Sequence, residues 1–160
     1  MLKVKIITVG KLKEGYLREA QGEYLKRLSA FCKAEVVELA EERLPDNPSV
    51  GEIAQCLKKE ADKIRKEIPA GAFVYSLQIE GKQISSEALA LKLEDMALAG
   101  KSTVVFIIGS SFGLEEALKK ENDFALSFSK MTFPHQLARI MLLEQVYRAF
   151  SINAGTKYHK

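Results

Sequence analysis

Hydrophobic patterns typical of strands and of helices alternate along the chain. Short apolar stretches of strand type lie at residues 2–9, 34–40, 73–79, 103–109 and 124–129. After each of them, apolar positions recur with helical spacing, over residues 14–31, 50–67, 85–99, 114–120 and 135–150. The stretch at 103–109, TVVFIIG, is the most continuous, which is typical of a strand buried on both faces of a parallel sheet. The alternation predicts an α/β fold with a mainly parallel sheet flanked by helices, in a single domain over residues 1–160.

The boundaries of these elements carry local signals. Ser49 and Glu52 have the spacing of a capping box at a helix start, and Pro134 suits the first turn of the last helix. Gly81 is expected to turn the chain after the third strand. The polar residues 41–48, EERLPDNP, are expected to form a loop within the domain.

Composition narrows the class of protein. Hydrophobic residues make up 47% of the chain and charged residues 28%, as in globular domains. No stretch approaches the roughly 20 apolar residues of a transmembrane helix, and the first residues have the pattern of a strand rather than of a signal peptide. We therefore expect a cytoplasmic protein. Cys32 and Cys56 lack a CxxC or His-rich context, so they are expected to be ordinary reduced thiols rather than zinc ligands.

Charge is unevenly distributed although the net charge is only +3. Residues 1–33 carry 8 basic and 3 acidic side chains, residues 34–126 carry 11 and 17, and residues 127–160 carry 5 and 1. If the two basic ends meet in space, they form a positive face that suits a polyanion. Chance clustering on a solvated surface is the alternative.

Ligands of parallel α/β sheets bind at the carboxyl ends of the strands. Three segments are expected there: Leu77-Gln78, residues 109–113 (GSSFG) and residues 129–135 (SKMTFPH). The GSSFG segment is neither a GxGxxG fingerprint nor a P-loop. Its two glycines either let the main chain approach a ligand closely or mark a plain strand-to-helix turn.

The last helix and the two histidines leave alternatives open. The helix is strongly apolar, with Leu137, Ile140, Met141, Leu143, Val146 and Phe150 among its apolar positions and Arg139 at a different angle. It packs either on its own sheet or against a partner such as a second copy. Glu144 and Arg148 have the i,i+4 spacing of an ion pair. His135 and His159 are structural residues or lie in the ligand region. No catalytic triad, carboxylate pair or metal-ligand spacing is present, which favours group transfer or a binding surface and disfavours hydrolysis and metal chemistry.

Several motifs together resemble a known family. These are ITVGKLKE near the start, VVFIIGSSFGL, LSFSKMTFPHQLARIMLLEQVYRAF and the closing YHK. Over residues 1–160 the sequence resembles the ribosomal RNA large subunit methyltransferase H family of small SPOUT-class methyltransferases. The block from LSFSKMTFPHQ to YHK is the specific part.

The resemblance implies a fold, an activity and partners. The fold would be a SPOUT fold with a trefoil knot near the C-terminus, which a strand pattern alone does not predict. The activity would be methyl transfer from S-adenosylmethionine to N3 of a pseudouridine in helix 69 of 23S rRNA. The protein would act as a homodimer on assembled ribosomes, without a metal and without a membrane.

The resemblance also assigns residues. The cofactor pocket would consist of Leu77, Gly109, Phe128, Ser129, Lys130, Met131, Thr132 and Phe133. Apolar walls and main-chain groups suit an adenine, and Gly109 has no Cβ to obstruct the cofactor.

The catalytic candidates are Arg148, Tyr158 and His159. Arg148 would stabilise charge on the uracil carbonyls or bind a phosphate, and His159 could accept the N3 proton. Tyr158 and His159 would close over the nucleotide, in the same subunit or across the dimer. The alternatives are that Arg148 only forms an ion pair with Glu144 and that the C-terminal tail with Tyr158 and His159 is disordered.

Other classes of protein are also compatible with the sequence. The first is an RNA-binding module without catalysis that uses the basic ends. The second is a methyltransferase of the same fold that acts on another RNA. A nucleotide-dependent oxidoreductase is disfavoured because its fingerprint is missing.

Overall fold

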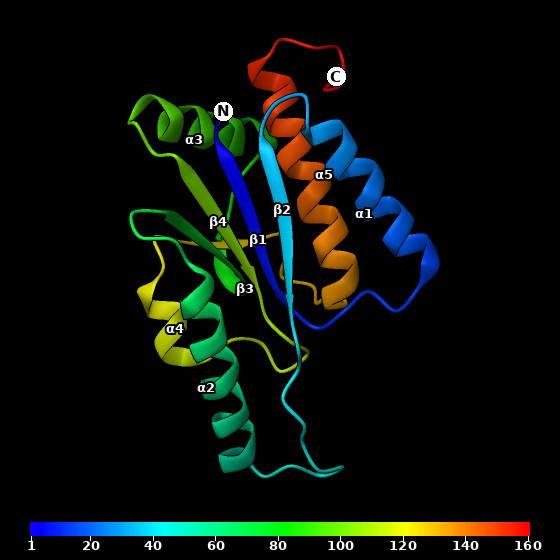
Figure 1. Cartoon of the computed structure of the whole chain (residues 1–160), viewed down its shortest axis with the longest axis vertical. Coiled ribbons are helices and arrows are strands. Elements are labelled where there is room, and N and C mark those ends of the chain that lie inside the picture. Colours follow the sequence, from blue (N-terminus) through cyan, green and yellow to red (C-terminus); the bar gives the residue numbers. More distant parts are fainter.

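The computed structural model describes all residues, 1–160, and contains one five-stranded parallel sheet with the order β2-β1-β4-β3-β5. The strands are β1 (Lys3–Val9), β2 (Lys33–Leu39), β3 (Phe73–Gln83), β4 (Thr103–Ile108) and β5 (Phe124–Ser127). The helices are α1 (Gly15–Leu28), α2 (Val50–Glu67), α3 (Ser86–Leu98), α4 (Glu116–Glu121) and α5 (His135–Asn153). The predicted α/β class and the alternation of strands and helices are confirmed (Figure 1). The trefoil knot stays a prediction of the resemblance.

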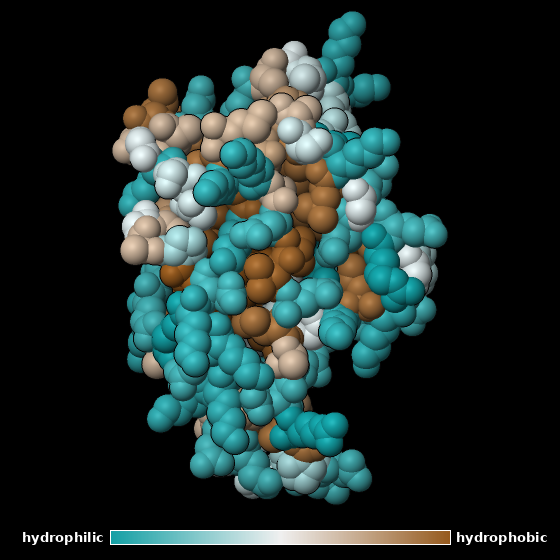
Figure 2. Space-filling view, in the orientation of Figure 1, coloured by the Kyte–Doolittle hydropathy of each residue, from teal (hydrophilic) through white to brown (hydrophobic).

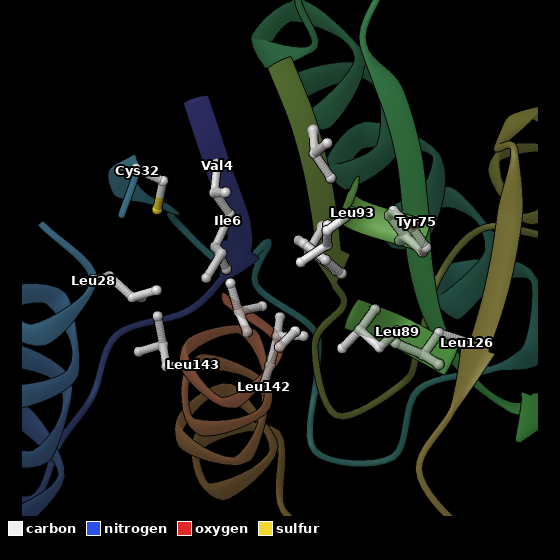
Figure 3. Close-up of a cluster of buried hydrophobic side chains, with 14 of the residues drawn as sticks. Val4, Ile6, Leu28, Cys32, Tyr75, Leu89, Leu93, Leu126, Leu142 and Leu143 are labelled. Atoms are coloured by element: carbon white, nitrogen blue, oxygen red, sulfur yellow. The ribbon is translucent and has the colours of Figure 1, made fainter. Parts of the chain in front are cut away.

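Helices cover both faces of the sheet and enclose two cores (Figure 1). Helices α1, α3 and α5 pack on one face, where Leu28, Leu93 and Leu142 are fully or almost fully buried (Figure 3). Helices α2 and α4 pack on the other face, where α2 buries Ile64 and α4 buries Leu118. In the view of Figure 2, hydrophilic side chains cover most of α2, and hydrophobic ones gather over the middle of the molecule. None of the helices combines the length and the apolar character that a membrane crossing requires.

The burial of β4 on both faces explains why its sequence is apolar from Val104 to Ile108. Val104 and Phe106 point into the core under α1, α3 and α5, whereas Val105 and Ile107 point into the core under α2 and α4. Successive strand residues face opposite sides of a sheet, so a strand covered on both sides needs no polar position. The sequence-based assignment of this strand is confirmed.

Gly81 lies in an irregular part of β3 and not, as expected, after the end of the strand. Strand β3 continues past Gly81 to Gln83, and its pairing with β5 shifts in register between Leu77 and Lys82. A Cβ on Gly81 would lie 2.7 Å from the carbonyl oxygen of Ala125. The glycine is therefore needed because two backbones approach closely where residues 78–81 bulge out of the pairing with β5.

Helix α5 buries an arginine that its apolar spacing did not reveal. The predicted apolar face included Leu137, which is 42% exposed, whereas Arg139 is fully buried. The Arg139 guanidinium pairs with Glu38 at 2.6 Å and also donates to the Thr8 hydroxyl and to the carbonyl oxygen of Gly10, both at 3.0 Å. These contacts tie the first turns of α5 to the carboxyl ends of β1 and β2.

We expect Arg139→Met to lower the free energy of unfolding by about 2–3 kcal/mol, measured by equilibrium urea denaturation. Methionine fills similar space but leaves Thr8 and the Gly10 carbonyl without their donor. The loss falls short of the largest values for broken buried pairs because the Glu38 side chain, 32% exposed, regains water. The matched control Arg27→Met removes an exposed pair with Glu23 and should cost far less. Equal losses in the two variants would contradict the anchoring role of Arg139.

Candidate functional site

A pocket of about 700 Å³ opens at the carboxyl edge of the sheet. It is formed by the end of β3, the loop after β4 and the segment between β5 and α5, which are the three segments that the sequence placed at this edge. Seven of the eight residues expected around a cofactor line it, namely Leu77, Gly109, Phe128, Ser129, Met131, Thr132 and Phe133. Lys130 is exposed and is not part of the lining.

The loop 109–113 is a tight turn that closes on itself. The amide of Gly113 donates to the carbonyl oxygen of Ser110 at 2.8 Å, and Gly113 has a φ of 87°. A Cβ on Gly109 would overlap the carbonyl oxygen of Gly113. Of the two reasons that the sequence allows for this glycine, close approach to a ligand and a tight turn, the structure supports the tight turn, and the approach to a ligand stays a prediction.

The segment from Ser127 to Pro134 is held by short side-chain contacts. The Ser127 hydroxyl lies 2.8 Å from the carbonyl oxygen of Ile79 and 3.1 Å from that of Ser129, and donates to one of them at a time. The Ser129 hydroxyl accepts from the amide of Met131 at 3.0 Å. Ser129 therefore serves the shape of the segment, in which Phe128 and Thr132 also line the pocket.

Apolar side chains at the pocket are left accessible to solvent. Ile79 and Phe112 are each 49% exposed and Met131 is 73% exposed. Together with Leu77 and Phe128 they offer apolar walls to a planar ring, and polar groups such as Glu80 and His135 complete the lining. Such a mixture is typical of a site for an organic cofactor. The chain forms no cluster of three or more His, Cys, Asp or Glu residues with the geometry of a metal site.

Two residues near the pocket were not singled out from the sequence as functional. Arg139 fixes the helix that follows the pocket segment. Glu60, in α2, is only 3% exposed and accepts a hydrogen bond from Ser110 at 3.0 Å. A signal for Glu60 exists in its spacing, because it lies four residues after Cys56 and four before Ile64, both on the buried side of α2.

Arg148, Tyr158 and His159 come together, but away from this pocket. Arg148 pairs with Glu144 at 2.6 Å, as the i,i+4 spacing indicated, and its guanidinium lies over the Tyr158 ring at 4.7 Å. None of the three lines the pocket. Arg148 lies 13 residues after His135 on α5, which is roughly 20 Å along the helix axis. The tail packs on its own helix, and within one chain it does not reach the pocket.

The contacts of His159 determine which of its two ring nitrogens carries the proton when the imidazole is neutral. Its Nδ1 lies 3.1 Å from an Arg148 nitrogen and its Nε2 lies 2.7 Å from Glu87. A guanidinium only donates, so Nδ1 accepts and Nε2–H donates to the carboxylate. The hydrogen bond from His159 lowers the pKa of Glu87, and burial together with Glu144 raises the pKa of Tyr158. In this arrangement Tyr158 is neutral at pH 7, and the lone pair of His159 Nδ1 accepts a hydrogen bond from Arg148.

A second hollow, of about 560 Å³, lies between α1, α3 and α5. It shares Leu126 and Phe128 with the pocket, and Glu144 lines it. Since Glu144 contacts both Arg148 and Tyr158, the tail cluster lies beside this second hollow.

Comparisons with known proteins agree along the whole chain. A family model described as "Predicted SPOUT methyltransferase" matches residues 2–159. The chain is 54% identical, over 99% of its length and 100% of the relative, to the "Ribosomal RNA large subunit methyltransferase H" of Bifidobacterium adolescentis. It is 49% identical, with the same coverage, to the "Putative ribosomal RNA large subunit methyltransferase H" of Methanococcus maripaludis. A protein of Streptococcus equi subsp. zooepidemicus that carries the same name as the first is 48% identical with the same coverage.

We expect Gly109→Ala to open the loop 109–113, because its Cβ displaces the Gly113 carbonyl. The amide of Gly113 should then exchange with solvent at least about tenfold faster in native-state hydrogen exchange, while the amides of β1 keep their protection. Gly22→Ala is the matched control, since nothing lies within 4 Å of a Cβ there. Unchanged exchange at Gly113 in the Gly109 variant would contradict this account of the loop.

Proposed function

The chain belongs to the SPOUT methyltransferase family, and from this premise we propose that it methylates the large-subunit ribosomal RNA with S-adenosylmethionine as the methyl donor. The acceptor in this proposal is N3 of a pseudouridine in helix 69 of 23S rRNA, on assembled ribosomes. The protein acts as one domain in the cytoplasm, where that substrate lies. The names of the three relatives support the RNA class.

The pocket at the carboxyl edge is the observation that carries the proposal. Its volume falls in the range of small-molecule sites, and its accessible apolar side chains suit an adenine ring. Residues of the tight loop 109–113 and of the segment 128–133 line the same pocket, and we assign the hydrogen bonds to the cofactor to their main-chain groups. When bound, the cofactor supplies a methyl group on a sulfonium sulfur. The chain's residues bind and orient it, and alignment of acceptor, methyl and sulfur is the main source of rate in such a transfer.

The acceptor nitrogen carries a proton that must leave. In this proposal Arg148 stabilises negative charge on the uracil carbonyls, and Tyr158 contacts the nucleotide. The lone pair of His159 Nδ1 faces Arg148 in the free protein. If Arg148 turns to the substrate, Nδ1 is released and can accept the N3 proton, with Glu87 still holding Nε2–H. Substrate binding would thus switch on the base.

The distance between the tail and the pocket supports a dimer. Because Arg148, Tyr158 and His159 do not reach the pocket of their own chain, the proposed chemistry needs a second copy. The second hollow beside the tail, walled by Tyr24, Ile140 and Met141, gives that copy an apolar surface to cover. In this arrangement the tail of one subunit completes the pocket of its partner.

The proposed function predicts incorporation of methyl label into ribosomes from a strain that lacks this protein. With tritiated S-adenosylmethionine, mass spectrometry of the digested RNA should identify N3-methylpseudouridine in 23S rRNA. Label at another nucleoside would support the enzyme class but assign a different target nucleotide. No label and no cofactor binding would contradict the proposal and leave an RNA-binding module.

Subunit mixing tests the shared site. Gly109→Ala disables the pocket, and the double variant Tyr158→Phe with His159→Ala disables the tail, so each homodimer should lose nearly all turnover. Mixed dimers, isolated with two different tags, contain one intact pocket opposite one intact tail. They should recover about half of the wild-type turnover per dimer, as expected for one of two sites related by twofold symmetry. Mixed dimers as inactive as their parents would rule out sharing across the interface.

A further inference from the structure

Glu60 is a buried carboxylate that the proposed chemistry does not use. It belongs to α2, is 3% exposed and forms no ion pair. The cations of the next helical turn are committed elsewhere, Lys63 to Glu42 and Arg65 to three other carboxylates, those of Asp62, Glu115 and Glu121. Burying an unpaired carboxylate is costly unless hydrogen bonds compensate, so the partners of Glu60 show what the residue holds.

Those partners lie in two loops at the carboxyl edge of the sheet. The Ser110 hydroxyl donates to Oε1 of Glu60 at 3.0 Å, and this bond is buried. The backbone N–H of Glu42 donates to Oε2 at 3.2 Å. Ser110 belongs to the loop after β4, which lines the pocket, and Glu42 to the loop after β2. One carboxylate therefore fastens both loops to α2.

The pocket loop has few other restraints. Within residues 109–113 only the Ser110 side chain forms a hydrogen bond, and the turn itself is closed by the Gly113 amide to the Ser110 carbonyl. A hydrogen bond to a charged acceptor in a dry setting is stronger than a neutral one. The Glu60 contact is accordingly a main source of order for the side of the pocket formed by this loop.

We propose that Glu60 is a positioning residue for the cofactor pocket, which holds the loop 109–113 through Ser110 in the shape that receives the methyl donor. The inference rests on the proposed function. It places the effect of Glu60 on cofactor binding rather than on the methyl-transfer step, because a loop ordered in advance saves the ligand the entropy of ordering it. The acceptor nucleotide and the tail cluster are not involved.

Glu60→Gln tests the proposal with little change in shape. The glutamine carbonyl can still accept from the Glu42 N–H, but its NH2 group can only donate to the Ser110 hydroxyl. The bond from Ser110 to a charged acceptor is therefore lost. The dissociation constant for S-adenosylmethionine, measured by titration calorimetry, should rise about tenfold, the size expected for one hydrogen bond to a charged group. The kcat at saturating S-adenosylmethionine should stay within about twofold, while the KM for this substrate rises with the dissociation constant.

Two further variants separate positioning from general stability. Ser110→Ala removes the same bond from the loop side, and combining it with Glu60→Gln should weaken binding no more than the stronger single change. Glu67→Gln is the matched control, because it makes the same change in the same helix and also removes the charge from a carboxylate that contacts another element, here in an ion pair with Lys5 at 3.1 Å, at the opposite end of the sheet. It should leave the dissociation constant unchanged.

The results that would overturn the proposal are distinct. Binding within twofold of wild type in both Glu60→Gln and Ser110→Ala would refute it, as would a loss of kcat with unchanged binding. Equal weakening in Glu67→Gln would assign the effect to helix stability. If Glu60→Gln does not fold, Ser110→Ala decides the question, since it leaves Glu60 in place. A wild-type protein that does not bind S-adenosylmethionine would refute the proposed function itself.

Discussion

The burial of β4 on both faces is the constraint on which the rest of the structure depends. Its side chains alternate between the two cores, so the strand must be central and must have helices on both sides. Its carboxyl end then opens between β1 and β3, and the loop 109–113 has to emerge there. The position of the pocket follows from this one strand, because the end of β3 and the segment after β5 lie along the same edge.

Buried polar side chains convert this edge into a shaped site. Arg139 ties α5 to the ends of β1 and β2, and Glu60 ties α2 to the loops after β2 and β4. Both residues belong to helices, and both hold backbone or hydroxyl groups at the carboxyl edge. Apolar packing fixes where the helices lie, whereas these directional bonds fix how the loops leave the strands.

The sequence was sufficient for the elements whose signals are local. The strand at 103–109, the capping box of Ser49 and Glu52, and the ion pair of Glu144 and Arg148 each depend on neighbours within a few residues. Parallel strands meeting at one edge also made the three pocket segments predictable. The strand order in the sheet had no comparable local signal.

The errors lie where distant residues decide. Arg139 lies 131 positions from Thr8 and 101 from Glu38, so a helical pattern alone gives no reason to bury it. Gly81 was expected to turn the chain, but a close approach to Ala125, 44 positions later in the sequence, explains it. The separation of the tail from the pocket also depends on the fold, because the pocket lies at the start of α5 and the tail packs near the end of this helix.

The most direct measurement of the central claim is a crystal structure of the protein with S-adenosylmethionine bound. The account predicts the ligand in the pocket between Gly109 and Phe133, with the loop 109–113 unmoved and the tail of a second subunit approaching the methyl group. A ligand in the hollow between α1, α3 and α5, or a loop rebuilt around the ligand, would contradict a pocket shaped in advance by the fold.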